Sequence, residues 1–241
     1  MSSRVALVTG GTRGIGKAIS VMLKQKGYTV VANYGGNDEA AKAFSEETGI
    51  PVIKFDVGKF AECEAAVKKI EAEHGPVDIV VNNAGITRDA VLHRMTPTQW
   101  DEVIQTNLTS CFNLARLVID KMRERGFGRI VNIGSINGQA GQYGQVNYAA
   151  AKSGIHGFTK ALAQEGAAKG VTVNAIAPGY VDTDMVRAVP PAVLEKIIAK
   201  IPVGRLGHAE DIARGVCFLV ADDADFITGT TLSINGGQHM Y

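Results

Sequence analysis

The sequence predicts an α/β fold in which a parallel sheet of about seven strands is doubly wound and flanked by helices on both faces. Two patterns carry this prediction. Short apolar runs alternate with longer amphipathic segments along the whole chain of 241 residues. The runs are apolar throughout rather than at every second position, which is typical of strands buried on both faces. Because the connections are short, each strand–helix–strand unit is expected to form a right-handed crossover between parallel strands.

The elements follow one another in a regular order. The apolar runs place strands at 5–9, 29–33, 52–56, 79–82, 129–133, 172–177 and 231–234. The amphipathic segments place helices at 14–26, 38–48, 60–73, 97–125, 147–169 and 209–220. Since no repeat or linker interrupts this order, we expect one domain over residues 1–241. Pro190, Pro191 and Pro202 break the pattern after the sixth strand, where we expect a short helical substrate flap near 183–208.

Composition and charge exclude several classes of protein. An apolar fraction of 46% with 20% charged residues is typical of a soluble globular domain and argues against disorder. Lys and Arg number 25 against 24 Asp and Glu, so the net charge of +1 lacks the footprint of a nucleic-acid-binding protein. The apolar runs are much shorter than the ~20 residues of a membrane span. We therefore expect neither nucleic acid nor a membrane as a partner.

The start of the chain and its cysteines bear on location. Residues 1–4 lead directly into the first apolar run, which is too short for the core of a signal peptide. Cys63, Cys111 and Cys217 are odd in number, far apart and outside any CxxC pair, as expected for reduced thiols. The histidines show no metal-ligand spacing. We therefore expect a cytoplasmic protein without a metal site.

A glycine-rich loop follows the first expected strand. Segment 9–16 reads TGGTRGIG and opens the first expected helix. Glycine permits a tight turn and lets the backbone approach a ligand, and the helix N-terminus offers free N–H groups to a pyrophosphate. The spacing is GxxxGxG rather than GxGxxG, so a tight turn without a ligand is the alternative. The strand–loop–helix setting favours a dinucleotide.

The end of the second strand bears on which dinucleotide binds. NAD-binding folds place an acid there to bond the ribose 2′-hydroxyl. Here the strand ends in Asn33 and Tyr34, and the first acid, Asp38, follows two glycines. Arg13 in the glycine loop is suited to a 2′-phosphate, although a solvated surface charge is the alternative. The sequence therefore favours NADP over NAD.

Tyr148 and Lys152 are four residues apart in an expected helix and so share one face. A tyrosine with a pKa near 10 transfers protons poorly at neutral pH, and a neighbouring ammonium lowers that pKa. The spacing alone is common by chance. However, Ser135 ends the fifth strand, where its hydroxyl can bond a substrate carbonyl. Asn107 lies inside a long expected helix, where an amide is unusual and can anchor a water next to Lys152; a packing role is the alternative.

These motifs together resemble the short-chain dehydrogenase/reductase family. TGGTRGIG, NNAG, Asn107, Ser135, the Tyr148-x-x-x-Lys152 pair and PGYVDT occur in this order and spacing, and the match covers essentially the whole chain. The resemblance implies a Rossmann-type sheet, a nicotinamide cofactor and a catalytic tetrad. In that tetrad Tyr148 is the general acid, Lys152 bonds the nicotinamide ribose and lowers the tyrosine pKa, Ser135 holds the carbonyl oxygen, and Asn107 keeps a proton-relay water. Gly134 departs from the serine of many relatives.

The resemblance also implies a set of residues around the cofactor. Asn83 and Gly85 would line it, Asp56 and Val57 would contact adenine, and Val181 and Thr183 the carboxamide. The expected cofactor-binding residues are Gly10, Thr12, Arg13, Gly14, Ile15, Gly16, Asp56, Val57, Asn83, Ala84, Gly85, Tyr148, Lys152, Pro178, Gly179, Val181 and Thr183.

Within the family, segments 82–89 and 179–186 are similar to reductases of 3-oxoacyl thioesters, and the glutamine-rich segment 135–148 resembles acetoacetyl-CoA reductases. The resemblance implies NADPH-dependent reduction of acetoacetyl-CoA to (R)-3-hydroxybutyryl-CoA for polyhydroxybutyrate. Gln142, Tyr143 and Gln145 would give the pocket polar walls, which suit a short acyl chain and pantetheine. The alternatives are that the glutamines bond the backbone of their own loop and that Tyr143 and Tyr180 serve only in aromatic packing. The expected substrate residues are Asp89, Gln142, Tyr143, Gln145 and Tyr180.

Other interpretations stay open at this point. A 3-oxoacyl-[acyl-carrier-protein] reductase would keep the chemistry and change the carrier. Another short-chain alcohol or sugar substrate and a non-catalytic NADP sensor are more remote, since a sensor is expected to have lost Tyr148 or Lys152, and both are present. The resemblance further suggests a homotetramer, with interfaces on the helices at 97–125 and 147–169 and on the C-terminal strand.

Overall fold

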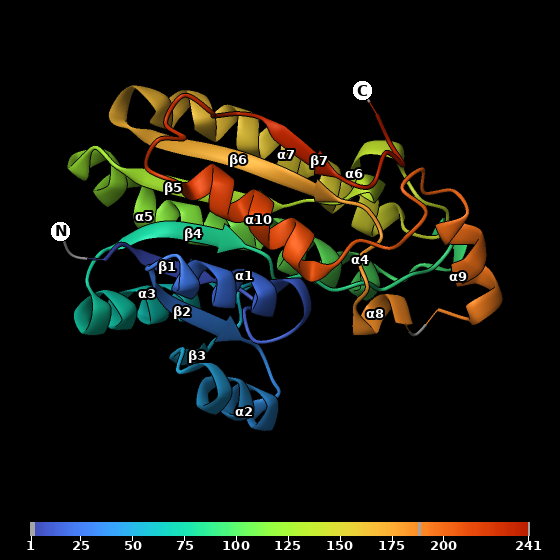
Figure 1. Ribbon diagram of the computed structural model, residues 1–241, viewed down its shortest axis with the longest axis horizontal. Helices are drawn as coiled ribbons and strands as arrows, with labels where there is room; N and C mark the ends of the chain where they lie inside the picture. The colour runs from blue at the N-terminus through green and yellow to red at the C-terminus, as the bar shows by residue number, and fades with distance from the viewer. Residues whose placement is uncertain (1–2, 188, 241) are drawn as a thin grey trace.

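The computed structural model describes residues 3–187 and 189–240, and within these ranges seven strands form one parallel sheet (Figure 1). Residues 1–2 and 241 of the expected domain, and residue 188 of the expected flap, lie outside the description. The strand order is β3-β2-β1-β4-β5-β6-β7. The strands are β1 Val5–Val8, β2 Thr29–Tyr34, β3 Val52–Lys54, β4 Val77–Asn82, β5 Gly128–Ile133, β6 Val171–Pro178 and β7 Thr231–Ile234. The predicted doubly wound parallel sheet is therefore confirmed.

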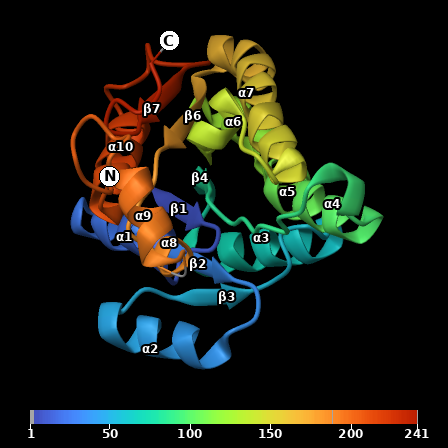
Figure 2. The same ribbon diagram turned by 90° about the vertical axis from the view of Figure 1, so that its right-hand side faces the viewer.

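The helices cover both faces of the sheet (Figure 2). They are α1 Gly14–Gln25, α2 Asp38–Thr48, α3 Phe60–His74, α4 Pro97–Ile104, α5 Ser110–Arg125, α6 Ile136–Ala140, α7 Val146–Gly166, α8 Asp184–Arg187, α9 Pro191–Ile198 and α10 Ala209–Val220. Helices α1 and α10 lie on one face, and α3, α5 and α7 lie on the other. All residues of β1, β4, β5 and β6 are buried, including polar ones such as Asp78, Arg129 and Asn174.

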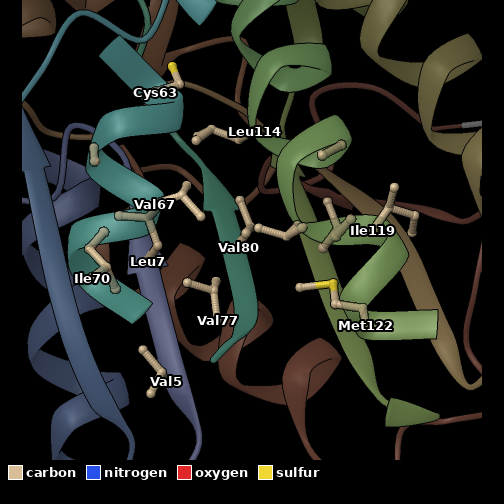
Figure 3. Packing of buried hydrophobic residues seen from close by; sticks show 14 of the residues in the cluster. Val5, Leu7, Cys63, Val67, Ile70, Val77, Val80, Leu114, Ile119 and Met122 are labelled. Carbon is tan, nitrogen blue, oxygen red and sulfur yellow. The ribbon is translucent and has the colours of Figure 1, made fainter. Parts of the chain in front are cut away.

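Alternate residues of each central strand enter opposite cores. Val5 and Leu7 of β1 pack toward α3 and α5, where Figure 3 shows them with Val67, Ile70 and neighbouring apolar side chains. Ala6 and Val8 point to the other core, which α1 and α10 close. This period of two is the geometry of an extended strand, so one short run of four apolar residues supplies both layers.

The topology creates a crevice at one edge of the sheet. From β1 the chain winds outward to β2 and β3, then returns to pair β4 with the other side of β1. Parallel strands present all their carboxyl ends at the same edge, and the reversal between β1 and β4 separates the loops there. Helices α6, α8 and α9 lie at this end of the molecule (Figure 1). The candidate active-site residues come from loops at this edge.

The long helical segment predicted at 97–125 is interrupted. Helix α4 begins with a capping box, in which Thr96 and Gln99 satisfy each other's backbone N–H groups, and Pro97 occupies the first turn. A π-helical turn, Gln105–Thr109, then separates α4 from α5. Such turns insert one residue into the helical repeat and often accompany functional sites. This one carries Asn107.

The segment after β6 is the part of the chain in which a flap is expected, near 183–208. Helices α8 and α9 lie between two chain ends that are joined by a parallel bridge of Val181 and Gly207. The Asp182 N–H donates to the Gly207 carbonyl at 2.8 Å, and the Gly207 N–H donates to the Tyr180 carbonyl at 2.8 Å. The base of the flap is thus anchored to the sheet. Among the helices of residues 3–187 and 189–240, none has the length and apolar character needed to cross a membrane.

Candidate active site

The glycine loop has a backbone that side chains would prevent. Gly10 and Gly14 have φ angles of 58° and 51°, in the left-handed region that favours glycine. A Cβ on Gly16 would stand 2.0 Å from the Gly10 carbonyl oxygen. Helix α1 begins at Gly14, directly after Arg13. The loop and the helix start therefore form a cradle for a pyrophosphate, which fits the bound dinucleotide that the sequence predicts.

Two asparagines hold this loop in place. The Gly10 N–H donates to Asn33 Oδ1 at 3.2 Å, and the Gly11 N–H donates to the Asn33 carbonyl at 2.9 Å. From the other side, Asn83 Nδ2 donates to the Thr9 carbonyl at 2.9 Å and to the Gly10 carbonyl at 3.2 Å. Asn83 is among the residues that the sequence predicts at the cofactor, whereas Asn33 has no predicted role. The sequence hints at Asn33 only by placing an amide at the end of the second strand, where NAD-binding folds usually have an acid.

The first acid after β2 is paired with a lysine. Both carboxylate oxygens of Asp38 accept from Lys54 Nζ, at 2.9 and 3.0 Å. Hydrogen bonding to Lys54, and then to Tyr34, lowers the pKa of Asp38. Arg13 is exposed at the start of α1, and the Cβ positions of Gly35 and Gly36 have open space within the described residues.

The predicted adenine contacts lie where β3 ends, but part of their polar capacity is used within the protein. Asp56 Oδ1 accepts from the Gly58 N–H at 2.9 Å, and the Asp56 N–H donates to Glu62. The Val57 carbonyl accepts from Asn113 Nδ2 at 2.9 Å, and the Val57 side chain is buried. These bonds shape the loop between β3 and α3.

Ser135, Tyr148 and Lys152 come together above the end of β5. Ser135 follows this strand directly and caps α6, while Tyr148 and Lys152 lie on successive turns of α7. Lys152 is only 4% exposed, and its Nζ donates to the Ile133 carbonyl at 2.7 Å. Its Nζ lies 5.7 Å from the centre of the Tyr148 ring. The tertiary fold thus gathers residues 17 positions or fewer apart into one group, in which Ser135 and Lys152 are buried and Tyr148 is partly exposed.

The electrostatics of this group differ from the expected downward shift of the tyrosine pKa. Burial raises the pKa of Tyr148, hydrogen bonding with Ser135 opposes the rise, and the Asp89 charge adds to it. Burial also lowers the pKa of Lys152 to about 8. The reason is desolvation, which disfavours both the phenolate and the ammonium. In this structure the pKa values of the two groups therefore move apart, that of the tyrosine upward and that of the lysine downward.

Asn107 and Lys152 meet at Gly85. Asn107 Oδ1 accepts from the Ile86 N–H at 2.8 Å, and its Nδ2 donates to the Ile86 carbonyl at 2.9 Å. A Cβ on Gly85 would stand 3.4 Å from Asn107 Oδ1 and 3.7 Å from Lys152 Nζ. The π-helical turn thus directs the Asn107 amide at the loop after β4, and glycine leaves space between that amide and the lysine.

The PGYVDT segment lies on the opposite side of the crevice. A Cβ on Gly14 would stand 3.8 Å from Thr183 Cγ2, so Thr183 lies beside the glycine loop. Pro178 ends β6, and Val181 is buried at the base of the flap. Tyr180 is half-buried and, with Gly179, borders a cavity of about 240 Å³ toward α10. The predicted carboxamide contacts are therefore near the predicted pyrophosphate loop.

The predicted substrate residues separate into two groups. Gln142 and Tyr143 are exposed, and Tyr143 retains 87% of its surface. Gln145 instead joins a network: its Nε2 donates to Asp89 Oδ2 at 2.8 Å, and its Oε1 accepts from Asn137 Nδ2 at 2.9 Å. The Asn137 N–H in turn donates to Ser135 Oγ at 3.1 Å.

This network leads from the loop after β4 to the predicted catalytic serine. Asp89 and Gln145 hold the short helix α6, and that helix orients the Ser135 hydroxyl. Helix α6 and Asn137 were not predicted from the sequence, because five residues are too few for a helical pattern.

Comparisons with known proteins agree with this architecture. A family model described as short chain dehydrogenase matches residues 4–193. An acetoacetyl-CoA reductase of Rhizobium meliloti is 67% identical over 239 residues, which cover 99% of both chains. An acetoacetyl-CoA reductase of Cupriavidus necator is 50% identical over the full length of both. A 3-oxoacyl-[acyl-carrier-protein] reductase of Escherichia coli is 46% identical over 98% of both.

The family match runs from β1 to the start of α9 and therefore includes the glycine loop, the π-helical turn and the Ser135–Lys152 region. Members of this family are oxidoreductases that work with a nicotinamide cofactor, and the cradle at Gly10–Gly16 fits one. The chain belongs to the short-chain dehydrogenase/reductase family.

Proposed function

We propose that the protein reduces acetoacetyl-CoA to (R)-3-hydroxybutyryl-CoA with NADPH. One observation carries the proposal: Ser135, Tyr148 and Lys152 come together at the crevice of a chain whose full-length relatives include acetoacetyl-CoA reductases at 50% and 67% identity. The thioester would enter from the side of Gln142 and Tyr143, which are exposed next to this group. The flap near 183–208 would close over it.

The residues divide the work of the reduction. Ser135 would hold the carbonyl oxygen of the substrate, and Tyr148 would donate the proton that this oxygen takes up. Lys152 would bond the cofactor ribose and stabilise the phenolate left on Tyr148, since a nearby ammonium favours that anion. Asn107 would hold a water that returns a proton through Lys152. When bound, the nicotinamide would supply the hydride that reaches the carbonyl carbon.

Selection of NADPH would rest on charge. Arg13 is exposed at the pyrophosphate cradle, and Asp38 is paired with Lys54 rather than free to repel a phosphate. A guanidinium binds phosphate in a bidentate manner and is always charged, which suits a 2′-phosphate. The described cysteines Cys63, Cys111 and Cys217 are free thiols, in keeping with a cytoplasmic enzyme.

We also propose a homotetramer. Phe60 and Phe112 are 41% and 51% exposed, and their rings lie 6.5 Å apart on the outer side of α3 and α5. Trp100 of α4 is exposed as well. Aromatic side chains gathered on helices are typical of subunit interfaces. A Phe112→Asp variant would shift the mass measured by light scattering to a smaller species if this face is an interface.

The function is tested by comparing two thioesters. NADPH oxidation is followed by near-ultraviolet absorbance with acetoacetyl-CoA and with acetoacetyl-acyl carrier protein at matched concentrations, and NADH replaces NADPH as a control. Faster turnover of the CoA ester with NADPH is expected. A preference for the carrier-protein ester that fades with added salt would instead support a 3-oxoacyl-[acyl-carrier-protein] reductase. Two relatives at 46% identity have this name.

A further inference from the structure

Asn147 is a fully buried asparagine directly before Tyr148, with a relative exposure of 0%. Its side-chain amide is fully engaged with three different parts of the chain. Nδ2 donates to the Arg88 carbonyl in the loop after β4 and to the Gln99 carbonyl in α4, both at 3.0 Å. Oδ1 accepts from the Tyr148 N–H at 2.8 Å.

The bond from the Tyr148 N–H to Asn147 Oδ1 compensates for the missing side-chain cap at the N-terminus of α7. The first N–H groups of a helix have no partner within it and are usually bonded by the side chain of the residue before the helix. At α7 that residue is Gln145, whose side chain makes no capping bond among the described residues and extends to Asp89 and Asn137 instead. Asn147 therefore bonds the N–H that the cap leaves free, and that N–H belongs to Tyr148.

The other two bonds fix where this first turn lies. The loop after β4 carries Asp89, which ends the network leading to Ser135. By bonding the neighbouring Arg88 carbonyl, Asn147 ties the turn that carries Tyr148 to the same loop that holds Ser135 in place. The bond to Gln99 adds a second, independent element, so the turn cannot slide along the loop.

We propose that Asn147 is a positioning residue that holds the Tyr148 hydroxyl in register with Ser135. The inference rests on the proposed function, in which these two hydroxyls act on one carbonyl oxygen. None of the motifs that indicated the family includes position 147, which lies in the glutamine-rich segment 135–148. A buried amide with all three bonds satisfied is rigid, and losing it would remove all three of these hydrogen bonds at once.

The test compares Asn147→Ala with a matched variant, Asn174→Ala. Asn174 is also fully buried and also bonds two backbone groups, Ile227 and Thr230, but it lies in the middle of β6. Both variants lose a comparable set of hydrogen bonds. Only Asn147→Ala is expected to lower kcat with acetoacetyl-CoA, by about ten-fold or more, while the Kd for NADPH stays within about two-fold of wild type.

A second readout does not depend on turnover. The ultraviolet difference between each protein and its Tyr148→Phe counterpart reports the ionisation of Tyr148 alone. Burial raises the pKa of Tyr148, and hydrogen bonding with Ser135 opposes that rise. If Asn147 holds the pair together, Asn147→Ala raises the pKa of Tyr148 further, and Asn174→Ala leaves it unchanged. Should Asn147→Ala not fold, Asn147→Ser is measured in the same way, with a smaller effect expected.

The outcomes separate the two proposals. Wild-type kcat and an unchanged Tyr148 pKa in Asn147→Ala would overturn the positioning role, and so would an equal loss of kcat in Asn174→Ala. If the wild-type protein does not turn over acetoacetyl-CoA, the proposed function fails and the Tyr148 titration alone decides the role of Asn147.

Discussion

The Nζ atom of Lys152 lies 5.7 Å from the centre of the Tyr148 ring, and both side chains belong to one face of α7. At this distance the lysine charge acts on the tyrosine through space, while its hydrogen bond goes to the Ile133 carbonyl. Burial disfavours both the phenolate and the ammonium, which raises the pKa of Tyr148 and lowers that of Lys152. Burying the lysine costs stability, and this cost can be measured separately from the activity that the pair supports.

Replacement of Tyr148 by phenylalanine is expected to remove most of the activity. The variant loses the proton donor but keeps the ring, so turnover falls by about 10²–10⁴-fold while NADPH binding stays nearly intact. NADPH oxidation and cofactor binding by fluorescence check the two parts. Tyr28→Phe, at the opposite edge of the sheet before β2, serves as the control. Wild-type turnover in Tyr148→Phe would exclude the proposed mechanism.

Replacement of Lys152 by methionine is expected to stabilise the protein at neutral pH. Burial lowers the pKa of Lys152 to about 8 from 10.5 in the unfolded chain. Below the folded pKa the lysine is charged in both states and its full desolvation cost is present. Between the two values the unfolded chain binds the extra proton, so the stability of the wild type rises with pH.

The free energy of unfolding of Lys152→Met should therefore exceed that of the wild type by about 1–3 kcal/mol at pH 7. This difference should shrink above pH 8. Urea unfolding across this pH range is the measurement. Lys160→Met, at an exposed position of the same helix, should change stability by less than about 0.5 kcal/mol throughout. A Lys152→Met protein that is less stable than the wild type at pH 7 would contradict the desolvation argument.

Addition of a methyl group at Gly16 is expected to disrupt the cradle. The new Cβ would stand 2.0 Å from the Gly10 carbonyl oxygen and 2.6 Å from Asn83 Nδ2, so the loop has to move. Gly16→Ala should weaken NADPH binding by at least about ten-fold, as titration by fluorescence would report. Gly157→Ala is the matched change, because a Cβ there meets nothing within 4 Å among the described residues. Equal affinities for NADPH in the two variants would argue against the cradle.

Loss of the Arg13 side chain is expected to affect one cofactor only. Arg13→Ala should raise the KM for NADPH about ten-fold and leave the KM for NADH unchanged, since only NADPH carries the 2′-phosphate. Added salt should narrow the difference between wild type and variant. Lys26→Ala, also exposed but beyond the other end of α1, controls for net charge. An equal rise in both KM values would place Arg13 at the pyrophosphate rather than at the 2′-phosphate.

Two glutamines that look alike in the sequence are expected to behave differently. Gln142 is exposed, so Gln142→Ala should raise the KM for acetoacetyl-CoA with little change in kcat. Gln145 bonds Asp89 and Asn137, so Gln145→Ala should instead lower kcat through the Ser135 network. Steady-state kinetics with saturating NADPH distinguishes the two. Identical profiles for both variants would mean that the network does not orient Ser135.

Much of the fold follows from local patterns. The apolar runs predicted all seven strands, and β7 has the predicted bounds at Thr231–Ile234. Helix α10 also has its predicted bounds, Ala209–Val220. Two elements were not predicted from the sequence, and each has a physical reason. The π-helical turn at Gln105–Thr109 leaves the amphipathic pattern intact, and α6 is too short to show a period.

The sequence by itself determined the family, the order of strands and helices, and the residue types at the cradle and at Tyr148 and Lys152. These are local properties: a glycine is required where φ is positive, and a spacing of four on a helix brings two side chains to one face. Only the tertiary structure decided how those residues are held. Asn33 and Asn147 act through partners that are distant in the sequence, and burial set the direction of the Tyr148 and Lys152 pKa shifts. Such contacts and desolvation arise when loops from different strands meet at the same edge of the sheet, and no local pattern encodes them.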